Sequence, residues 1–403
     1  MIGDQATFQQ EGGTPMNYVG IDYHKKYSHV TAIDEEARVM RSRRLENRPE
    51  AFEEFFKRLE GPNEAVWEAS QTWGVMYDLL EAIDEVDSVQ LAHSQKVRAI
   101  AEAKIKTDKI DSHILAQLLR ADLIPAAYIP GKRTRSHKEM IRQRVFLVRM
   151  RTRLKNRIHV LLDRLHISLP SVTDIFGKRG TDYLRKLNLP GVDGEILRED
   201  LELLEVFNRL IKEAEKEIAS LMGEDPRVTL LRTVPGLGPI LAAVVALEID
   251  HIERFSLPSK LASYAGLVPS TYASGGRIFH GKLIPMTNKW LRWALVEAAW
   301  GAIRQSPYCS TYFEAHQRHK GPHTAAIALA RRLIEIIWHV LMENRNYEER
   351  LPRAHRLEKA AAVQSLSESK SPTGDDPQSS QRGVAQLQRK RNINSSPAAL
   401  TAT

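Results

Sequence analysis

The sequence predicts a mixed α/β domain followed by two mainly helical regions. Three β-rich runs, residues 17–24, 28–34 and 38–46, follow one another with gaps too short for helices, which indicates antiparallel pairing. After them, helical and strand patterns alternate up to about residue 121, and this alternation is typical of an α/β sheet. From residue 131 onward the pattern is almost wholly helical.

Local signals define the remaining elements of the α/β region. Asn47 is expected as the N-cap of a helix over residues 47–60. Pro49 stands in the first turn of this helix, and Glu50 is placed for a capping box. Strands are expected at residues 64–70 and 88–94, and further helices at residues 73–84 and 106–121, which completes a sheet with mixed pairing.

Two carboxylates stand at the beginning of the helix expected at residues 106–121. Asp108 and Asp111 are three residues apart, so both project from one face of the first turn. Acidic residues are favoured at this end of a helix by the helix dipole and by free backbone amides. Taken alone, the pair therefore fits a solvated helix start better than half of a metal site.

Two further acids are expected to join this pair. Asp22 ends the first strand run and Glu68 ends the strand at residues 64–70, so both can point toward the same edge of the sheet. Four carboxylates gathered in this way repel one another unless divalent cations neutralise them, and hard oxygen ligands suit Mg²⁺ or Mn²⁺. Strand, strand and helix supplying Asp, Glu, Asp and Asp is the arrangement of ribonuclease-H-like nucleases, in which metal ions assist phosphoryl transfer. The alternatives are a strand-end turn residue at Asp22 and a helix-dipole partner at Glu68.

Composition limits the classes of function. A chain of 403 residues with 42% hydrophobic residues is long enough for two or three domains. Its formal charge of +8 and pI of about 9.4 suggest a polyanionic partner, nucleic acid before membrane. A single cysteine, Cys309, excludes a disulfide framework and a structural zinc cluster. The longest apolar run, residues 240–247, is too short to span a bilayer, and no signal peptide is recognisable, so a cytoplasmic location is expected.

Residues 131–166 predict one long basic helix. From Lys132 to Arg164, twelve lysines and arginines stand against two acidic residues. A solvated helix face normally mixes signs, so this one-sided charge favours a track for nucleic acid. The helix is expected to pack through Ile141, Val145, Val148, Leu154 and Ile158. The candidate nucleic-acid contacts are Arg149, Arg151, Arg153, Lys155 and Arg157.

A second long helix is predicted at residues 197–222, with apolar residues at spacings of three and four and acidic residues between them. It could pack against the basic helix as an antiparallel hairpin, or pair with another subunit as a coiled coil. No element is predicted for residues 166–196.

The third region contains two candidate phosphate-binding features. Gly236 and Gly238 precede an apolar helix, either as the turn of a helix-hairpin-helix element that approaches phosphate or as an ordinary tight turn. Residues 261–283 are expected to form a loop in which Ser274 is followed by two glycines. The nearby cations Arg277 and Lys282 would stabilise a phosphate attacked by Ser274, although the composition also fits a flexible turn.

Six stretches follow one another along residues 18–345: YVGIDYHK, WEAS, KTDKID, VPGLGP, LASYAGLVPSTYASGG and KWLRWAL. Each is common, but the combination resembles the DEDD-type insertion-sequence transposases, a family of bridge-RNA-guided serine recombinases. The resemblance implies a RuvC-like, RNase H-like domain over residues 17–130, a helical or coiled-coil segment over 131–225 and a mostly α-helical transposase domain over 226–350. Residues 1–16 and 351–403 are expected to be disordered from their composition.

The resemblance also implies roles for individual residues. Asp22, Glu68, Asp108 and Asp111 match the family's metal ligands, Ser274 matches its nucleophile, and Ser270 matches a variable position. One departure is visible, because Pro285 and Thr287 stand where the family commonly has lysine and glycine. Arg292, a further candidate nucleic-acid contact, is in place.

The activity implied by the resemblance is transposition in a prokaryotic cytoplasm, close to the nucleoid. A bridge RNA would pair with donor and target double-stranded DNA, and a dimer or tetramer would bring Ser274 and the Mg²⁺ ligands together from different subunits. Two alternatives remain open from the residues themselves. One is a metal-dependent, structure-specific nuclease that uses water, and the other is a non-catalytic RNA-binding protein.

Overall fold

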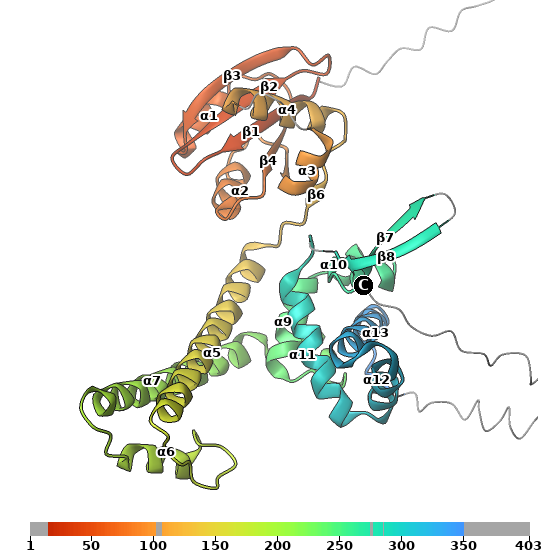
Figure 1. Ribbon diagram of the computed structural model, residues 1–403. Coiled ribbons are helices and arrows are strands. Elements are labelled where there is room, and N and C mark those ends of the chain that lie inside the picture. Colours follow the sequence, from red (N-terminus) through yellow and green to blue (C-terminus); the bar gives the residue numbers. More distant parts are fainter. Residues whose placement is uncertain (1–14, 102–106, 275–276, 285, 350–403) are drawn as a thin grey trace, which may run out of the picture. The chain divides into compact units, whose positions relative to one another are not determined.

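The computed structural model describes residues 15–101, 107–274, 277–284 and 286–349 (Figure 1). The segments expected to be disordered therefore lie outside the described residues, apart from Pro15 and Met16. The chain divides into two compact units, one ending at Ser136 and the other beginning at His137.

The first unit is built on the predicted mixed sheet. Its strands lie in the order β3-β2-β1-β4-β5-β6, with β1 antiparallel to β2 and parallel to β4. The α/β prediction is confirmed, and β6 is an addition to it. The strands are β1 (Asn17–Tyr23), β2 (Tyr27–Ile33), β3 (Val39–Glu46), β4 (Asn63–Glu68), β5 (Ser88–Ala92) and β6 (Ala126–Ala127).

Helices cover both faces of this sheet (Figure 1). Phenylalanines of α1 and the apolar residues of α2 form one core with Val19, Ile21 and Trp67. On the other face, Leu115 and Leu118 of α4 pack against Val66. The helices are α1 (Pro49–Phe56), α2 (Trp73–Glu81), α3 (Ser94–Ile100), which was not predicted, and α4 (Asp108–Arg120).

The prediction of Asn47 as a helix cap is wrong. The N-cap of α1 is Arg48, and no side chain caps this helix. The Asn47 amide instead donates to the carbonyl of His24 at 2.6 Å and accepts from the Ser28 hydroxyl at 2.7 Å. It therefore ties the end of β3 to the turn between β1 and β2.

The second unit contains an antiparallel helical hairpin. Helix α5 (Lys132–Arg164), which begins just before the division between the units, runs against α7 (Val192–Met222), with α6 (Lys178–Lys186) between them in the chain. Successive contacts join Arg144 to Glu215, Arg157 to Asp200 and Arg164 to Asp193, so the partner number falls as the α5 number rises. Of the two arrangements left open by the sequence, the described contacts are those of the hairpin. Leu147, rather than Val148, completes the buried stripe of α5.

The rest of the second unit is a helical core with one small sheet. The segment expected as a loop at residues 261–283 contains the end of a helix and two antiparallel strands instead, because β7 and β8 pair from Thr271 with His280 to Ser274 with Arg277. Apolar residues of α9, α11 and α13 build the core. The elements are α8 (Pro226–Leu231), α9 (Pro239–Ile249), η1 (Ile252–Arg254), α10 (Pro258–Tyr264), β7 (Pro269–Ser274), β8 (Arg277–Leu283), α11 (Lys289–Gln305), α12 (Pro307–Lys320) and α13 (Pro322–Met342).

Candidate metal centre and serine hairpin

Two of the predicted acids stand on adjacent parallel strands. Gly20 lies beside Val66 and Ile21 beside Trp67 in the register of β1 and β4. The next residue pair along these strands is Asp22 and Glu68, and the alternation of side chains puts both on the face covered by α4. The sheet register therefore brings Asp22 and Glu68 to one strand end, as the sequence predicted.

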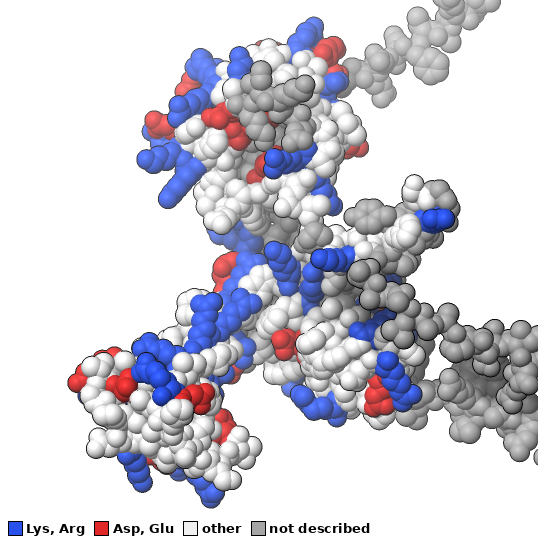
Figure 2. Space-filling view, viewed as in Figure 1, with Lys and Arg blue, Asp and Glu red and all other residues white. Residues whose placement is uncertain are grey.

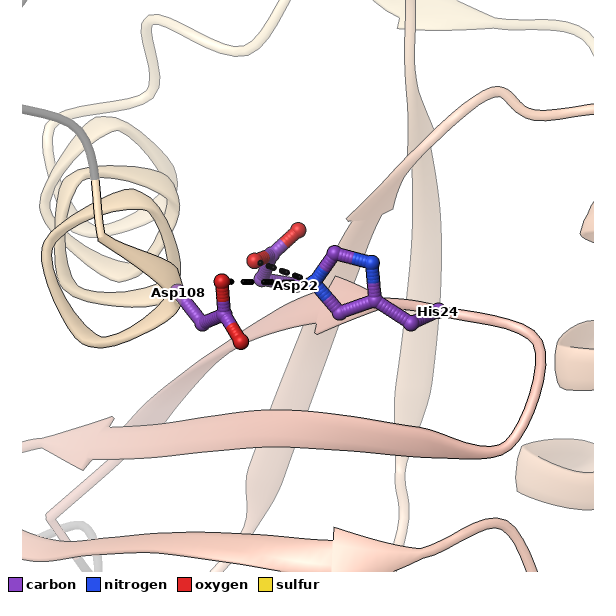
Figure 3. A group of neighbouring side chains, drawn as sticks. All are labelled: Asp22, His24 and Asp108. Atoms are coloured by element: carbon purple, nitrogen blue, oxygen red, sulfur yellow. Dashed lines mark hydrogen bonds and ion pairs between the residues drawn. The ribbon is translucent and has the colours of Figure 1, made fainter.

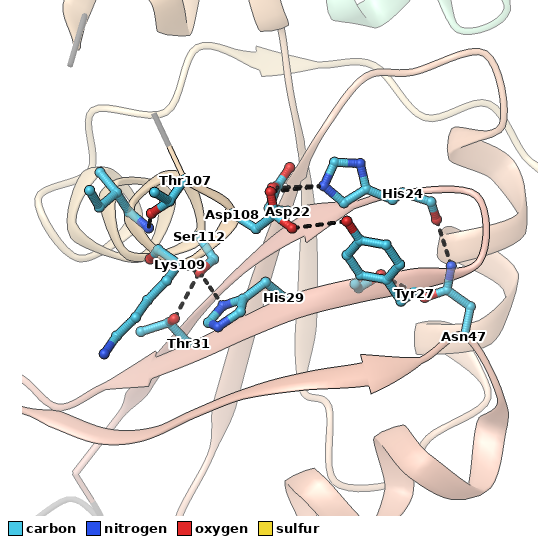
Figure 4. Close-up of polar contacts among 12 residues, drawn as sticks. Asp22, His24, Tyr27, His29, Thr31, Asn47, Thr107, Asp108, Lys109 and Ser112 are labelled. Atoms are coloured by element: carbon cyan, nitrogen blue, oxygen red, sulfur yellow. Dashed lines mark hydrogen bonds and ion pairs between the residues drawn. The ribbon is translucent and has the colours of Figure 1, made fainter. Parts of the chain in front are cut away.

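Helix α4 reaches this strand end through a close approach at Gly20. A Cβ atom on Gly20 would lie 2.0 Å from the carbonyl oxygen of Ser112 and 2.5 Å from the amide nitrogen of Ala116. The hydroxyl of Ser112 is fully buried and lies 2.9 Å from Nδ1 of His29 and 2.8 Å from the hydroxyl of Thr31 (Figure 4). These contacts fix the position of α4 on the sheet, and Asp108 and Asp111 lie in the first turn of this helix.

The start of α4 is fixed by Thr107. Its side chain accepts a hydrogen bond from the amide of Ile110 at 3.3 Å, as an N-cap does. Capping by Thr107 leaves the carboxylates of Asp108 and Asp111 available for other contacts. Their position in the first turn agrees with the prediction.

Asp22, His24 and Asp108 form a compact cluster (Figure 3). The Nε2 atom of His24 lies 3.1 Å from Oδ2 of Asp22 and 3.4 Å from Oδ1 of Asp108. The hydroxyl of Tyr27 donates to the other oxygen of Asp108 at 3.1 Å (Figure 4). Strand β1, the following turn, strand β2 and helix α4 thus meet at one point.

The two aspartates of this cluster respond differently to it. Burial raises the pKa of Asp22 above its ordinary value, and the charges of Asp108 and Asp111 add to the rise against the opposing effect of His24. Burial also acts to raise the pKa of Asp108, but the hydrogen bond from Tyr27 and the proximity of His24 outweigh it and lower the pKa. A bound cation would oppose the rise in the pKa of Asp22, because it favours the charged carboxylate.

A cavity of about 270 Å³ opens beside the cluster. Asp22, Glu68 and Asp111 line it together with Arg98, and Val97, Ile114 and Leu115 form an apolar wall. The predicted acids thus divide into two groups that share Asp22: Asp108 in the cluster, and Glu68 with Asp111 in the cavity. Carboxylate oxygens converging from several elements fit a hard divalent cation, and the imidazole of His24 is a further possible ligand for Mn²⁺.

His24 and Tyr27 are the site residues that the sequence reasoning missed. Both follow Asp22 in the turn and strand after β1, within five positions of it. The signal was their proximity to a predicted metal ligand at a strand end. Their contact with Asp108 spans more than eighty residues, and only the packing of α4 reveals it.

Ser274, the predicted nucleophile, belongs to the second unit. It is the last residue of β7, it is exposed, and it stands opposite Arg277 at the start of β8. The side chains of Arg277 and Lys282 are also exposed. Ser270, in contrast, donates its hydroxyl to the carbonyl of Lys282 at 3.1 Å and so braces the hairpin. Gly275, Gly276 and the side chain of His280 lie outside the described part of the chain.

Arg292 supports the base of this hairpin. Its guanidinium donates to the carbonyls of Ala265 and Ile284, at 3.3 and 2.6 Å, and to the hydroxyl of Thr287 at 2.5 Å. Gly266 has a φ of +67°, and a Cβ atom there would lie 2.0 Å from the same guanidinium. The family departure at Thr287 is therefore part of the Arg292 contact, whereas Pro285 lies outside the described residues. These bonds give Arg292 a structural task at a position predicted to contact nucleic acid.

Several predicted nucleic-acid contacts on α5 have partners within the second unit. Arg151 donates to Asn208, Arg157 pairs with Asp200, and Arg149 lies over the ring of Trp290. Lys155 lies over the ring of Phe176.

Arg153 is exposed, and no ion pair to it is found among the described residues. The one-sided charge of α5 is thus partly balanced by the acids of α7.

Gly236 serves close packing. It has a φ of +82°, and a Cβ atom there would lie 2.0 Å from the carbonyl oxygen of Ala298 in α11. Its amide donates to the side chain of Gln305 at 2.8 Å. Gly238 is the N-cap of α9 and has open space around its Cα. The tight-turn alternative therefore explains Gly236, while Gly238 keeps room for a ligand.

Within the described residues, every helix is too short or too polar to cross a bilayer.

Comparison with known proteins gives consistent matches over both units. A family model described as a transposase of the DEDD type matches residues 19–167, and one described as the transposase IS116/IS110/IS902 family matches residues 228–314. A probable family 20 transposase of Pseudomonas aeruginosa is 26% identical over 82% of this chain and 98% of its own length. The transposase for insertion sequence element IS1328 of Yersinia enterocolitica is 26% identical over 62% of this chain and 75% of its own. An IS110 protein of Streptomyces coelicolor is 33% identical over 36% of each chain.

Proposed function

Because the chain belongs to the IS116/IS110/IS902 family of transposases, we propose that it is a DNA recombinase that uses Ser274 as nucleophile and a divalent cation at its acidic site. The observation that carries the proposal is the gathering of Asp22, Glu68, Asp108 and Asp111 at one strand end of the first unit. The exposed position of Ser274 at the end of β7 is consistent with a residue that must reach a DNA phosphate.

The acidic site would hold Mg²⁺ or Mn²⁺ through these four residues. Such an ion polarises a phosphate and stabilises the negative charge of a leaving oxygen. Tyr27 fixes one oxygen of Asp108 through its hydrogen bond, so the carboxylate turns its other oxygen toward Asp22 and His24.

The serine step would proceed by substitution at phosphorus. The Oγ atom of Ser274 forms a bond to the phosphorus, the bond to the 3′ oxygen breaks, and the serine proton passes to solvent while the leaving oxygen is protonated. The resulting phosphoserine ester conserves one phosphodiester bond, so attack by a 3′ hydroxyl of another strand can religate DNA without ATP. Arg277, which faces Ser274 across the hairpin, is the nearest cation in register for the charged phosphate.

The partners in this proposal are donor and target double-stranded DNA and a bridge RNA, held by a dimer or tetramer. The formal charge of +8 supports a nucleic-acid partner in general. Guidance by RNA follows from the family resemblance, and a reaction without RNA tests it separately.

A covalent adduct tests the proposal. Full-length protein, Mg²⁺, end-labelled DNA carrying the element junction and RNA transcribed from the element ends are mixed, denatured and separated. We expect labelled DNA attached to the wild type and to Ser270→Ala, and none attached to Ser274→Ala. Omission of RNA should abolish the adduct.

Cleavage of DNA by wild type and Ser274→Ala to the same extent, with no adduct in either, would sink the serine mechanism. The acidic site would then be that of a nuclease in which water attacks. An adduct that forms equally well without RNA would remove the guide from the proposal and leave the serine chemistry in place.

A further inference from the structure

We infer that Tyr27 and Arg44 form a phosphate-binding arm beside the acidic site, which takes a backbone phosphate of the DNA strand next to the one that reacts. The inference rests on the proposed function, because it assumes that a DNA phosphate enters the acidic site.

The arm begins at the acidic site itself. The hydroxyl of Tyr27 bonds to Oδ2 of Asp108, and the Cζ atom of Arg44 lies 3.6 Å from the centre of the Tyr27 ring. Asp108, Tyr27 and Arg44 therefore form a continuous line of contacts from α4 across β2 to β3. The Tyr27 ring thus carries the guanidinium on its face and the contact with the carboxylate at its hydroxyl.

The sheet register places the arm on the correct face. Arg44 stands opposite His29 on β2, and His29 contacts Ser112 of α4. Alternation along a strand puts Arg44 on this α4 face and its neighbour Arg43 on the other. Arg41, on the same face as Arg43, lies over the ring of Phe55 in α1, which agrees with this assignment.

The guanidinium of Arg44 is exposed, and no carboxylate pairs with it among the residues with described positions. Its neighbours differ, since Arg48 pairs with Glu46 at 2.9 Å and Arg38 pairs with Asp34 at 2.6 Å. Stacking on Tyr27 restricts the side chain without using its N–H groups as donors to a carboxylate. A pre-positioned guanidinium with free donors matches the two-oxygen geometry of a phosphate.

The surrounding charge favours the same ligand. Lys25 and Lys26 in the turn before β2, and Lys109 next to Asp108, are exposed. Figure 2 shows lysine and arginine side chains along the β3 side of the first unit. A partner that spans this basic edge and the acidic site needs repeated negative charges, one neutralised by bound cations and the next by Arg44. A DNA strand has this pattern, because its phosphates recur at every nucleotide.

Arg43 provides a matched control for the test. Arg43→Ala and Arg44→Ala each remove one exposed arginine from β3, and neither residue has an ion-pair partner among the described side chains. The two variants have the same net charge, so a general electrostatic effect must be equal in both. A difference between them reports the face of the strand that meets the DNA.

The affinity of full-length protein for a fluorescent double-stranded oligonucleotide of the element end is measured with bridge RNA bound and Ca²⁺ in place of Mg²⁺, over a series of salt concentrations. We expect Arg44→Ala to bind about tenfold more weakly than wild type, because a hydrogen bond between charged groups is lost. The slope of log affinity against log salt should fall by about one unit. Arg43→Ala should bind within about twofold of wild type.

Tyr27→Phe tests the contact of Tyr27 with Asp108 separately from its contact with Arg44. It keeps the ring under Arg44 and removes the hydrogen bond to Asp108, so DNA affinity should stay near that of the wild type while cleavage in Mg²⁺ becomes slower. Thermal melting of each variant shows whether it is folded.

Equal losses of DNA affinity in Arg43→Ala and Arg44→Ala would overturn the arm, and so would an unchanged DNA affinity in Arg44→Ala. In both cases the wild type still cleaves DNA and the proposed function stands. A wild type that neither binds nor cleaves the DNA would remove the proposed function and the arm with it.

Discussion

The carbonyl oxygen of Ser112 lies 2.0 Å from the point at which a side chain on Gly20 would begin. This contact sets the distance between α4 and β1, and with it the distance between the acids of the helix and Asp22. The acidic site therefore depends on the absence of one Cβ atom on the central strand of the sheet.

Gly20→Ala is expected to push α4 away from the sheet. Overpacking of this kind costs about 1–3 kcal/mol of unfolding free energy, which chemical denaturation can measure. The rate of DNA cleavage by the folded variant should also fall, because Asp108 and Asp111 move together with the helix. Gly131→Ala is a suitable control, since a Cβ atom there meets nothing within 4 Å. Full activity in Gly20→Ala would show that the close contact is not needed for the site.

Asp22→Asn should raise the melting temperature of the metal-free protein at neutral pH. Burial and the nearby charges of Asp108 and Asp111 raise the pKa of Asp22, so the folded state holds this proton more tightly than the unfolded state. The associated stability is present below the ordinary pKa of an aspartate and is lost as pH rises through the raised value. Melting in EDTA over a pH series should show the gain of the variant disappear in acid.

Mg²⁺ should stabilise the wild type and have little effect on Asp22→Asn, because binding to the folded state alone raises the melting temperature. Asp34→Asn is a control, because its effect on the melting temperature at neutral pH should be opposite to that of Asp22→Asn. Burial acts to raise the pKa of Asp34, but hydrogen bonds from Arg38 lower it, so this variant should melt below the wild type at neutral pH and retain its response to Mg²⁺. Equal responses of wild type and Asp22→Asn to Mg²⁺ would place the ion elsewhere.

Arg153→Ala and Arg157→Ala should distinguish an arginine of α5 that binds nucleic acid from one that stabilises the fold. Asp200 is buried, its side chain is 2% exposed, and Arg157 lies 3.2 Å from its Oδ2 atom. Loss of Arg157 leaves a buried carboxylate without its cation and should lower the unfolding free energy by on the order of 1–3 kcal/mol. Arg153→Ala should leave the urea midpoint unchanged and weaken nucleic-acid binding. If Arg153→Ala lowers the urea midpoint and leaves nucleic-acid binding unchanged, α5 is not a nucleic-acid track centred on Arg153.

Arg292→Ala should loosen the hairpin formed by β7 and β8, which carries Ser274. The carbonyls of Ala265 and Ile284 lose their donor, at a cost of about 1–3 kcal/mol if they stay buried. Limited proteolysis should then cut residues 269–283 faster than in the wild type. Arg277→Ala, at the exposed end of the hairpin, should keep the wild-type cleavage pattern in this assay and reduce only the affinity for DNA.

Sequence periodicity was sufficient for most elements of the fold. Strands β1 to β5, helices α1, α2 and α4, and the long helices α5 and α7 were all predicted, because hydrophobic spacing and turn residues are local signals. It failed where local signals were weak or ambiguous, as at α3, α6 and the β7–β8 hairpin. The cap of α1 was assigned to Asn47 because this residue type favours N-caps, but tertiary contacts with His24 and Ser28 engage its side chain instead.

The sequence by itself determined which acids stand at strand ends and in the first turn of a helix, and which helix carries the positive charge. Only the tertiary structure decided the partners of these groups. His24 and Tyr27 meet Asp108, Arg157 meets Asp200, and Arg44 stacks on Tyr27. The physical reason is that spacing along the chain fixes the face on which a side chain lies, whereas strand register and the close approach of a helix at one glycine fix what that face meets.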